Sequence, residues 1–487
     1  SYDTAELARI ALPLARNHRL ATLAQLLQLP LGRHHRAEDD ARACGRLFVA
    51  LVERLGQMDM GLLQFILAVG EPAGWSLAPL FRAEFAAREA RGERPLPATE
   101  WIRPFAGPLH RPEHESEPDE PAPIDPALVL SVLGSGGVIS EAIPHYEHRP
   151  QQLELAEAVA RAFNDGAHLL MEAGTGTGKS LAYLVPAFAW AKANGEKVAI
   201  STHTITLQEQ LWEKDIPFLQ SALSGTPLEG VQAALVKGRS NYICLRKWEE
   251  AAVGADFLTS LEERRFMIRL AGWLAHTQTG DRSELNLTGE EERFWRTVQS
   301  ETETCLGPKC KWFRHHCFAF RARRRARDAQ VLAVNHALLF ADIATGNQIL
   351  PPFRQLVIDE AHHLEAVATQ NLGVNLESWD ITGALLFLYR APGQGLLPQL
   401  RRRLRKGEVI PARPPVGLPH EDLIDKLVAL IQHCRAAADE LFRLCAELVE
   451  ARGGSDAEGG TRALRLTDAV RSGPLWDALE QARANAV

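Results

Sequence analysis

The sequence predicts an α/β fold, a doubly wound parallel sheet with helices on both faces. Four short apolar runs alternate with helical patterns and are typical of strands buried on both faces: 169–171, 198–200, 331–334 and 356–358. A glycine-rich loop follows the first run, and a pair of carboxylates follows the last. Strands of one parallel sheet end at a common edge, so we expect the loop and the carboxylates to form one site.

Composition limits the class of protein. The chain has 487 residues, 46% of them hydrophobic, with 54 Lys+Arg against 61 Asp+Glu and a net charge of −7. This excludes a disordered or collagen-like chain and suggests about three domains. The apolar runs are all shorter than the roughly 18 residues of a membrane span. The acidic total argues against a uniformly basic nucleic-acid coat but allows a local basic patch.

The composition changes along the chain and predicts the domain boundaries. Residues 1–103 show helical spacing, and 104–126 combine seven prolines with six acidic residues, which is typical of an extended linker. We expect the parallel sheet in 127–375, interrupted by an insertion at about 240–328 that carries four cysteines. A second helical region follows over 376–487. The odd total of seven cysteines and the missing secretory signal favour a thiol-reducing, cytoplasmic compartment.

The glycine-rich loop matches the Walker A pattern, with Ala173 in place of the usual first glycine. Backbone N–H groups of such a loop cradle phosphates, Lys179 would reach the β and γ phosphates, and Ser180 would bind Mg²⁺. An ordinary glycine-rich turn is the alternative. The predicted nucleotide-binding residues are Gly174, Thr175, Gly176, Thr177, Gly178, Lys179 and Ser180.

The carboxylate pair lies in the sequence LVIDEAHH, at the end of an apolar strand. Asp359 is placed to hold Mg²⁺ through water, and Glu360 to polarise the attacking water as general base. A lone pair of this kind is usually a solvated strand end. Together with the Walker A loop in one sheet, it predicts a site that binds and hydrolyses ATP with Mg²⁺.

Two weaker patterns lie near the predicted site. Arg149 and Gln152 precede the phosphate loop by about 20 residues, and a glutamine amide matches the adenine edge, so we expect them to read the base. Thr202 and Thr204 follow the 198–200 run, where hydroxyls could contact a sugar–phosphate backbone. A helix cap is the alternative for the threonines.

Four cysteines of the insertion have the spacing of a metal centre. Cys305, Cys310 and Cys317 form C-x4-C-x6-C, and Cys244 would be a distant fourth ligand. Four thiolates suit Zn²⁺ or an iron–sulfur cluster, and the missing C-x2-C knuckles favour the cluster. Unrelated buried thiols are the alternative.

The segment 305–327 carries eight basic residues, no acidic ones and four interleaved aromatic residues. Charges for phosphates and rings for base stacking are what single-stranded nucleic acid requires. We expect Arg321 and Arg324 to contact DNA, and a solvated helix face is the alternative.

These motifs occur in an order that resembles DinG-type helicases, superfamily 2 enzymes similar to XPD. The resemblance rests on EAGTGTGKS, STHTITLQEQL, KGRSNYIC, VNHALLFAD and VIDEAHHLE, with the three further cysteines between them. It implies a RecA-like P-loop motor, a 4Fe–4S cluster on the four cysteines, a helical arch over 376–487, and ATP-driven 5′→3′ movement on single-stranded or forked DNA. We expect a monomer that acts in DNA repair or replication.

The first hundred residues resemble the last third of a DnaQ-type 3′→5′ exonuclease. His35 and Asp40 fit its closing H-x4-D motif, in which the histidine is general base and the aspartate a Mg²⁺ ligand. The earlier acidic motifs of that fold and the second motor domain of the helicase have no counterpart in this sequence. We therefore expect the chain to be part of a longer enzyme.

Two other functional classes stay open. One is a 3′→5′ exonuclease whose motor half mainly binds nucleic acid. The other is a binding module with negligible turnover, because the sequence holds one half of a motor.

Overall fold

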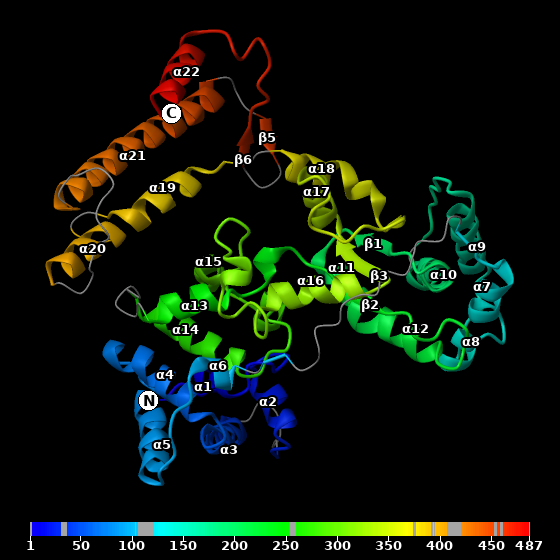
Figure 1. Cartoon of the computed structure of the whole chain (residues 1–487), viewed down its shortest axis with the longest axis horizontal. Helices are drawn as coiled ribbons and strands as arrows, with labels where there is room; N and C mark the ends of the chain where they lie inside the picture. Colours follow the sequence, from blue (N-terminus) through cyan, green and yellow to red (C-terminus); the bar gives the residue numbers. More distant parts are fainter. Residues whose placement is uncertain are drawn as a thin grey trace. The chain divides into compact units, whose positions relative to one another are not determined.

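The computed structural model describes residues 2–30, 37–102, 104–105, 121–174, 176–253, 260–373, 376–390, 393, 395–406, 420–451, 455–457 and 461–486. The chain forms two compact units, Ser1–Leu372 and Gly373–Val487 (Figure 1).

A parallel sheet lies at the centre of the first unit and confirms the predicted α/β class. Within the described residues it has four strands in the order β2-β3-β1-β4, with β1 (Val198–Thr202), β2 (Ala233–Leu235), β3 (Val331–Asn335) and β4 (Gln355–Ile358). Val198 pairs with both Val331 and Gln355, so three strands begin in register and end at one edge. The sequence did not predict β2, because its Ala-Ala-Leu run is short and has low β propensity.

Helices cover both faces of this sheet. Val331 and Ala333 face a core shared with α7 (Pro126–Leu133), α9 (Pro150–Asp165) and α10 (Lys179–Asn194). Leu332 and Val334 face a second core with residues of α16 (Phe318–Asp328) and α17 (His336–Ala344). The alternation along β3 follows from the two-residue repeat of a strand. The elements that complete this region are α8 (Val138–Ala142), α11 (Ile205–Gln210), the π-helical turn η2 (Leu211–Asp215), α12 (Ile216–Ala222), η7 (Ala361–His363) and α18 (Leu364–Leu372).

The prediction of a buried strand at 169–171 is wrong. The segment has no ladder partner among the described residues, and the Leu170 side chain is 91% exposed. Leu356 on β4 is also exposed. An apolar run becomes a strand only where a neighbouring backbone accepts its hydrogen bonds, which sequence pattern cannot supply.

The helices of the first hundred residues share one apolar core with the cysteine-bearing insertion. In Figure 1, α1 (Thr4–Ala11) and α4 (Met60–Gly70) lie against α14 (Leu261–Leu274). The remaining elements of this region are α2 (Leu20–Leu26), α3 (Ala37–Leu55), η1 (Glu71–Ala73), α5 (Ala78–Ala90), α6 (Ala98–Trp101), η3 (Arg239–Asn241), α13 (Leu245–Val253), η5 (Arg282–Leu285), α15 (Gly289–Val298) and η6 (Gly307–Lys309).

Polar contacts reinforce this shared core. Glu6 on α1 accepts a hydrogen bond from Trp75 Nε1 at 2.8 Å and pairs with Arg265 of α14 at 3.1 Å. Tryptophans from both parts meet, with the rings of Trp101 and Trp248 5.9 Å apart and edge to face. The two sequence regions thus form one folded body.

The predicted linker is described only at its two ends, since residues 106–120 lie outside the described residues. Before them, Phe105 N–H donates to the carbonyl of His315 at 2.8 Å. After them, the Asn194 side chain accepts from Ala122 N–H and the Asn164 side chain accepts from Ile124 N–H, both at 2.6 Å. Residues 121–125 therefore lie against the sheet-covering helices.

The second unit is helical, with one small hairpin. Its elements are α19 (Ser378–Leu388), α20 (Leu396–Arg405), α21 (His420–Ala451), β5 (Ser455–Ala457), β6 (Thr461–Ala463) and α22 (Pro474–Ala486). Leu397, Ile424 and Ile431 form its buried cluster. Among the helices described in either unit, none has the length and apolarity needed to cross a bilayer.

Two glycines give a test of the shared core. A Cβ on Gly272 of α14 would lie 2.7 Å from the carbonyl oxygen of Ile10, whereas a Cβ on Gly45 of α3 would meet nothing within 4 Å. We expect Gly272→Ala to destabilise the protein by about 1–3 kcal/mol, because it forces α1 and α14 apart. Gly45→Ala should stabilise it by roughly 0.5–1 kcal/mol through helix propensity. Chemical denaturation measures both, and equal effects would contradict the described packing.

Candidate nucleotide-hydrolysis site

The phosphate loop leads into the N-terminus of α10. Gly176 (φ +83°) and Gly178 (φ +79°) adopt left-handed backbone that only glycine enters without strain. Thr177 Oγ1 donates to the carbonyl of Gly174 at 2.9 Å. Thr175 lies outside the described residues. The first N–H groups of α10 point out of the helix and are available to an anion.

The two residues expected to read adenine contact this loop. The Gln152 side chain is buried, and its Nε2 donates to the carbonyl of Gly178 at 2.9 Å. Arg149 donates to the carbonyl of Gly176 and pairs with Glu147 at 3.0 Å. In this structure both side chains support the loop, since glycine carbonyls without side chains beside them are open to donors.

The end of β4 brings the carboxylate pair to the same edge of the sheet. Asp359 N–H donates to the carbonyl of Ser201 at 2.8 Å, which extends the β1–β4 ladder by one bond. Tyr183 of α10 donates its hydroxyl to Asp359 Oδ2 at 3.2 Å. Burial and the adjacent Asp359 charge raise the pKa of Tyr183, so this hydroxyl keeps its proton.

Glu360 faces the phosphate loop. Its carboxylate lies 3.1 Å from Lys179 Nζ, with both side chains about one-third exposed. The hydrogen bond from Lys179 is the main cause that lowers the pKa of Glu360. Its backbone has φ +57°, a strained conformation for a residue with a side chain, and such strain gathers at functional sites. The predicted lysine and general base are thus in direct contact.

Ser180 lies on the next position of α10, beside Asp215. Burial raises the pKa of Asp215, and a hydrogen bond from Ser180 opposes that rise. Asp215 was not identified from the sequence, because it lies 35 positions after Ser180 and belongs to no recognisable motif. Ser180, Asp215 and Asp359 offer three oxygen donors on neighbouring elements.

Histidines behind the carboxylates were also missed. His336 is fully buried and its Nδ1 lies 2.7 Å from Ser201 Oγ, and burial lowers its pKa. His203 stacks on His363 with ring centroids 3.7 Å apart. These rings connect the segment after β1 with the segment after β4. The only sequence signal was their position directly after apolar runs.

The threonines after β1 differ from the expectation. Thr202 is buried and its hydroxyl donates within the protein, to the carbonyls of Thr204 at 3.3 Å and Val334 at 3.5 Å. Thr204 is the N-cap of α11 and accepts from Leu207 N–H at 3.2 Å. Thr204 is exposed and Thr202 is not, so the pair does not form one polar surface.

Three of the four insertion cysteines influence one another electrostatically, and the fourth, Cys310, lies near Arg246 together with Cys244. Burial raises the pKa of Cys317, and the charges of Cys244 and Cys305 raise it further. A hydrogen bond to Glu250 is the main cause that raises the pKa of Arg246, and the charges of Cys244 and Cys310 raise it further. Gly307 N–H donates to Cys305 Sγ at 3.4 Å. Across the described part of the chain, no three His, Cys, Asp or Glu side chains are grouped as ligands of a single metal ion.

The basic segment is less open than expected. Trp312 and Phe318 are buried, and the rings of Phe313 and Phe320 pack on each other at 4.0 Å, so these rings are engaged within the protein. Arg321 donates to the carbonyl of Gln278 at 2.9 Å and lies over the Phe105 ring. Burial lowers the pKa of Arg321 to about 10. Arg324 is half-buried.

The exonuclease candidates are only partly visible. Asp40 is exposed in the first turn of α3, beside Glu38 and Asp39. His35 lies outside the described residues.

Comparison with known proteins gives a consistent family. Residues 149–244 match the DEAD/DEAH box helicase family. The 3′-5′ exonuclease DinG of Bacillus subtilis is 30% identical over 92% of this chain and 46% of its own length. The chain belongs to the DinG-type family.

Other DinG-type relatives match about half of the chain at higher identity. The ATP-dependent helicase DinG of Mycobacterium tuberculosis is 40% identical over 52% of this chain and 38% of its own length. The ATP-dependent DNA helicase YoaA of Escherichia coli is 38% identical over 50% of this chain and 37% of its own length. The chain thus spans less than half the length of each of these relatives.

The Lys179–Glu360 contact gives a pH test. A lowered carboxyl pKa means that the pair stabilises the fold above the ordinary glutamate pKa and is lost as pH falls through the folded value. Exposure limits this contribution to about 1 kcal/mol or less. We expect Lys179→Ala to raise the pKa of Glu360, measured by carboxyl ¹³C NMR titration. Lys192→Ala on the same helix should leave it unchanged, and an unchanged Glu360 in Lys179→Ala would contradict the contact.

Proposed function

We propose that the protein is an ATP-dependent DNA helicase whose motor hydrolyses Mg-ATP at Lys179, Asp359 and Glu360. The contact between Lys179 and Glu360, residues 181 positions apart, carries the proposal. A phosphate-binding lysine and a carboxylate that can activate water, close together in one site, are parts that hydrolysis of a bound nucleotide requires. The names of the DinG and YoaA helicase relatives support it.

The residues divide the work. Backbone N–H groups around Gly176 and Gly178 bind the phosphates, and Lys179 turns from Glu360 to the β and γ phosphates. Loss of its lysine partner lets the pKa of Glu360 rise toward the ordinary value, which makes the carboxylate a better base for the attacking water. Mg²⁺ would be held by Ser180 and Asp359 and would neutralise phosphate charge. Arg149 and Gln152 hold the loop in shape.

The nucleic-acid side of the proposal uses the exposed surface after β1 and the insertion. Thr204 at the start of α11 and Arg324 on α16 are our proposed DNA contacts. Single-stranded or forked DNA, 5′→3′ movement, a monomeric state and a cytoplasmic location complete the proposal. The predicted boundaries, including the exonuclease-like part over 1–103, remain predictions.

Cys244, Cys305, Cys310 and Cys317 would hold a 4Fe–4S cluster. The four thiols are partly buried, and the thiolate charges of Cys244 and Cys305 act on Cys317, which fits such a group in number and kind of ligand. Arg246 and Arg323 lie close enough to offset thiolate charge. The cluster would cross-link separate points of the insertion, and two of its proposed ligands, Cys310 and Cys317, pack against the apolar core that includes Trp312 and Phe318.

The ATPase prediction separates binding from hydrolysis. In the whole protein, Glu360→Gln should keep Mg-ATP binding and lower DNA-stimulated kcat about 10²–10⁴-fold, because the base is lost. Lys179→Ala should weaken binding as well. Glu365→Gln, an exposed neighbour on α18, is the control for both assays. Full hydrolysis in Glu360→Gln would reject the assigned roles.

The cluster prediction has a chemical readout. Anaerobically purified protein should be brown and contain about four iron and four sulfide per chain. Cys317→Ser should lose this iron, and Cys44→Ser, at an exposed cysteine outside the proposed ligands, should keep it. Stoichiometric zinc without iron or sulfide would refute the cluster.

A 3′→5′ exonuclease is the second candidate, favoured by the name of the relative that matches 92% of the chain. In the whole protein it predicts Mg²⁺-dependent shortening of 3′ ends that survives Lys179→Ala and is lost in Asp40→Asn. Asp39→Asn is the neighbouring control. Degradation that instead requires Lys179 would argue against an independent nuclease.

A further inference from the structure

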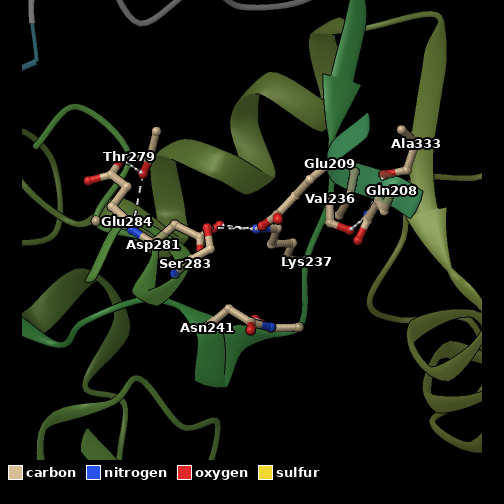
Figure 2. A network of polar contacts seen from close by, with 12 residues as sticks. Gln208, Glu209, Val236, Lys237, Asn241, Thr279, Asp281, Ser283, Glu284 and Ala333 are labelled. Carbon is tan, nitrogen blue, oxygen red and sulfur yellow. Dashed lines mark hydrogen bonds and ion pairs between the residues drawn. The ribbon is translucent and has the colours of Figure 1, made fainter. Parts of the chain in front are cut away.

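A buried lysine joins the sheet region to the cysteine-bearing insertion. Lys237 follows β2, and its side chain is 2% exposed. Figure 2 shows its Nζ between two carboxylates, Glu209 Oε1 and Asp281 Oδ2, each at 2.6 Å, with Ser283 Oγ at 3.1 Å. The nucleotide site does not use any of these groups. A buried charge persists only where partners of this kind compensate its desolvation.

Glu209 belongs to α11, which begins at the proposed DNA contact Thr204. The neighbouring Gln208 is fully buried, and its Nε2 donates to the carbonyls of Val236 at 2.8 Å and Ala333 at 2.9 Å (Figure 2). Gln208 thus fixes α11 to the strands, while Glu209 reaches across to Lys237. A shift of α11 therefore moves the carboxylate that holds the lysine.

Asp281 belongs to the insertion. Its other oxygen caps η5 by accepting from Ser283 N–H at 3.0 Å, and its own N–H donates to Thr279 Oγ1 at 3.0 Å. Asp281 also forms a β-bridge with Tyr242, two residues before Cys244. Asp281 is therefore held by the same short pairing that positions one proposed cluster ligand.

The charge balance makes Lys237 the shared element. One ammonium serves two carboxylates from different parts of the chain, so either carboxylate can be neutralised while the lysine keeps one partner. Removal of the lysine would instead leave two carboxylates facing each other in a buried site, which is strongly unfavourable. The glutamate and aspartate positions are therefore the better places to test the joint.

We propose that Lys237 is a positioning residue that couples DNA engagement at α11 to the cysteine-bearing insertion. The proposal deepens and rests on the proposed helicase function. When DNA binds at Thr204, the backbone of α11 opens less often. Through the Glu209–Lys237–Asp281 connection, the backbone of residues 277–285 then opens less often as well. Cutting the connection on either side uncouples the two regions without removing the DNA-binding surface.

Hydrogen–deuterium exchange of the whole protein, with and without a 20-nucleotide oligodeoxythymidine, tests this coupling. In the unaltered protein, DNA should slow exchange at 202–210 and at 277–285, each by threefold or more. In Glu209→Gln and in Asp281→Asn, protection should remain at 202–210 and fall below 1.5-fold at 277–285. The double variant should resemble either single variant, because one break already cuts the connection.

Glu213→Gln, an exposed neighbour of α11, is the matched control and should behave like the unaltered protein. If DNA protects 277–285 in both single variants as strongly as in the unaltered protein, the coupling is overturned and the helicase proposal stands. Protection confined to 202–210 in the unaltered protein would do the same. No effect of DNA at 202–210 would overturn the proposed function, and the coupling with it.

Discussion

The hydrogen bond from Asp359 N–H to the carbonyl of Ser201 fixes the geometry on which the candidate site depends. It extends the parallel β1–β4 ladder beyond the last strand residue, so the chain turns only after Asp359. Glu360 then takes a left-handed backbone, and its carboxylate meets Lys179 across the edge of the sheet. Because β1 and β4 run in register, Asp359 and Glu360 follow β4 at the same edge where β1 ends, and Lys179 at the start of α10 contacts Glu360 there.

Side chains of the sequence motifs mostly contact the protein's own backbone. Gln152 contacts the phosphate loop, Gln208 fixes α11 to two strands, and Thr204 caps α11. Arg321 holds the Gln278 carbonyl within the insertion. These contacts fix loops that carry functional groups, and they engage the polar groups of these side chains within the protein. The reaction chemistry is left to a small set of residues around Lys179 and Glu360.

The sequence predicted the parallel sheet and both halves of the nucleotide motif, because glycine conformations and strand-end carboxylates are local requirements. It did not predict the pairing of β2, nor that 169–171 would have no strand partner among the described residues, since ladder partners come from distant residues. It also missed the core shared by α1, α4 and α14, which only tertiary packing defines. The sequence also did not predict the burial of Thr202 and Phe318, because residue type does not show which face of an element is covered.

In the proposed mechanism, Lys179 exchanges a protein carboxylate for a nucleotide phosphate. A crystal structure of the protein with Mg²⁺ and a non-hydrolysable ATP analogue tests it most directly. We expect Lys179 Nζ to leave Glu360 and contact the β and γ phosphates, with Glu360 facing the position of the attacking water. Nucleotide bound elsewhere, with the 3.1 Å contact between Lys179 and Glu360 intact, would contradict it.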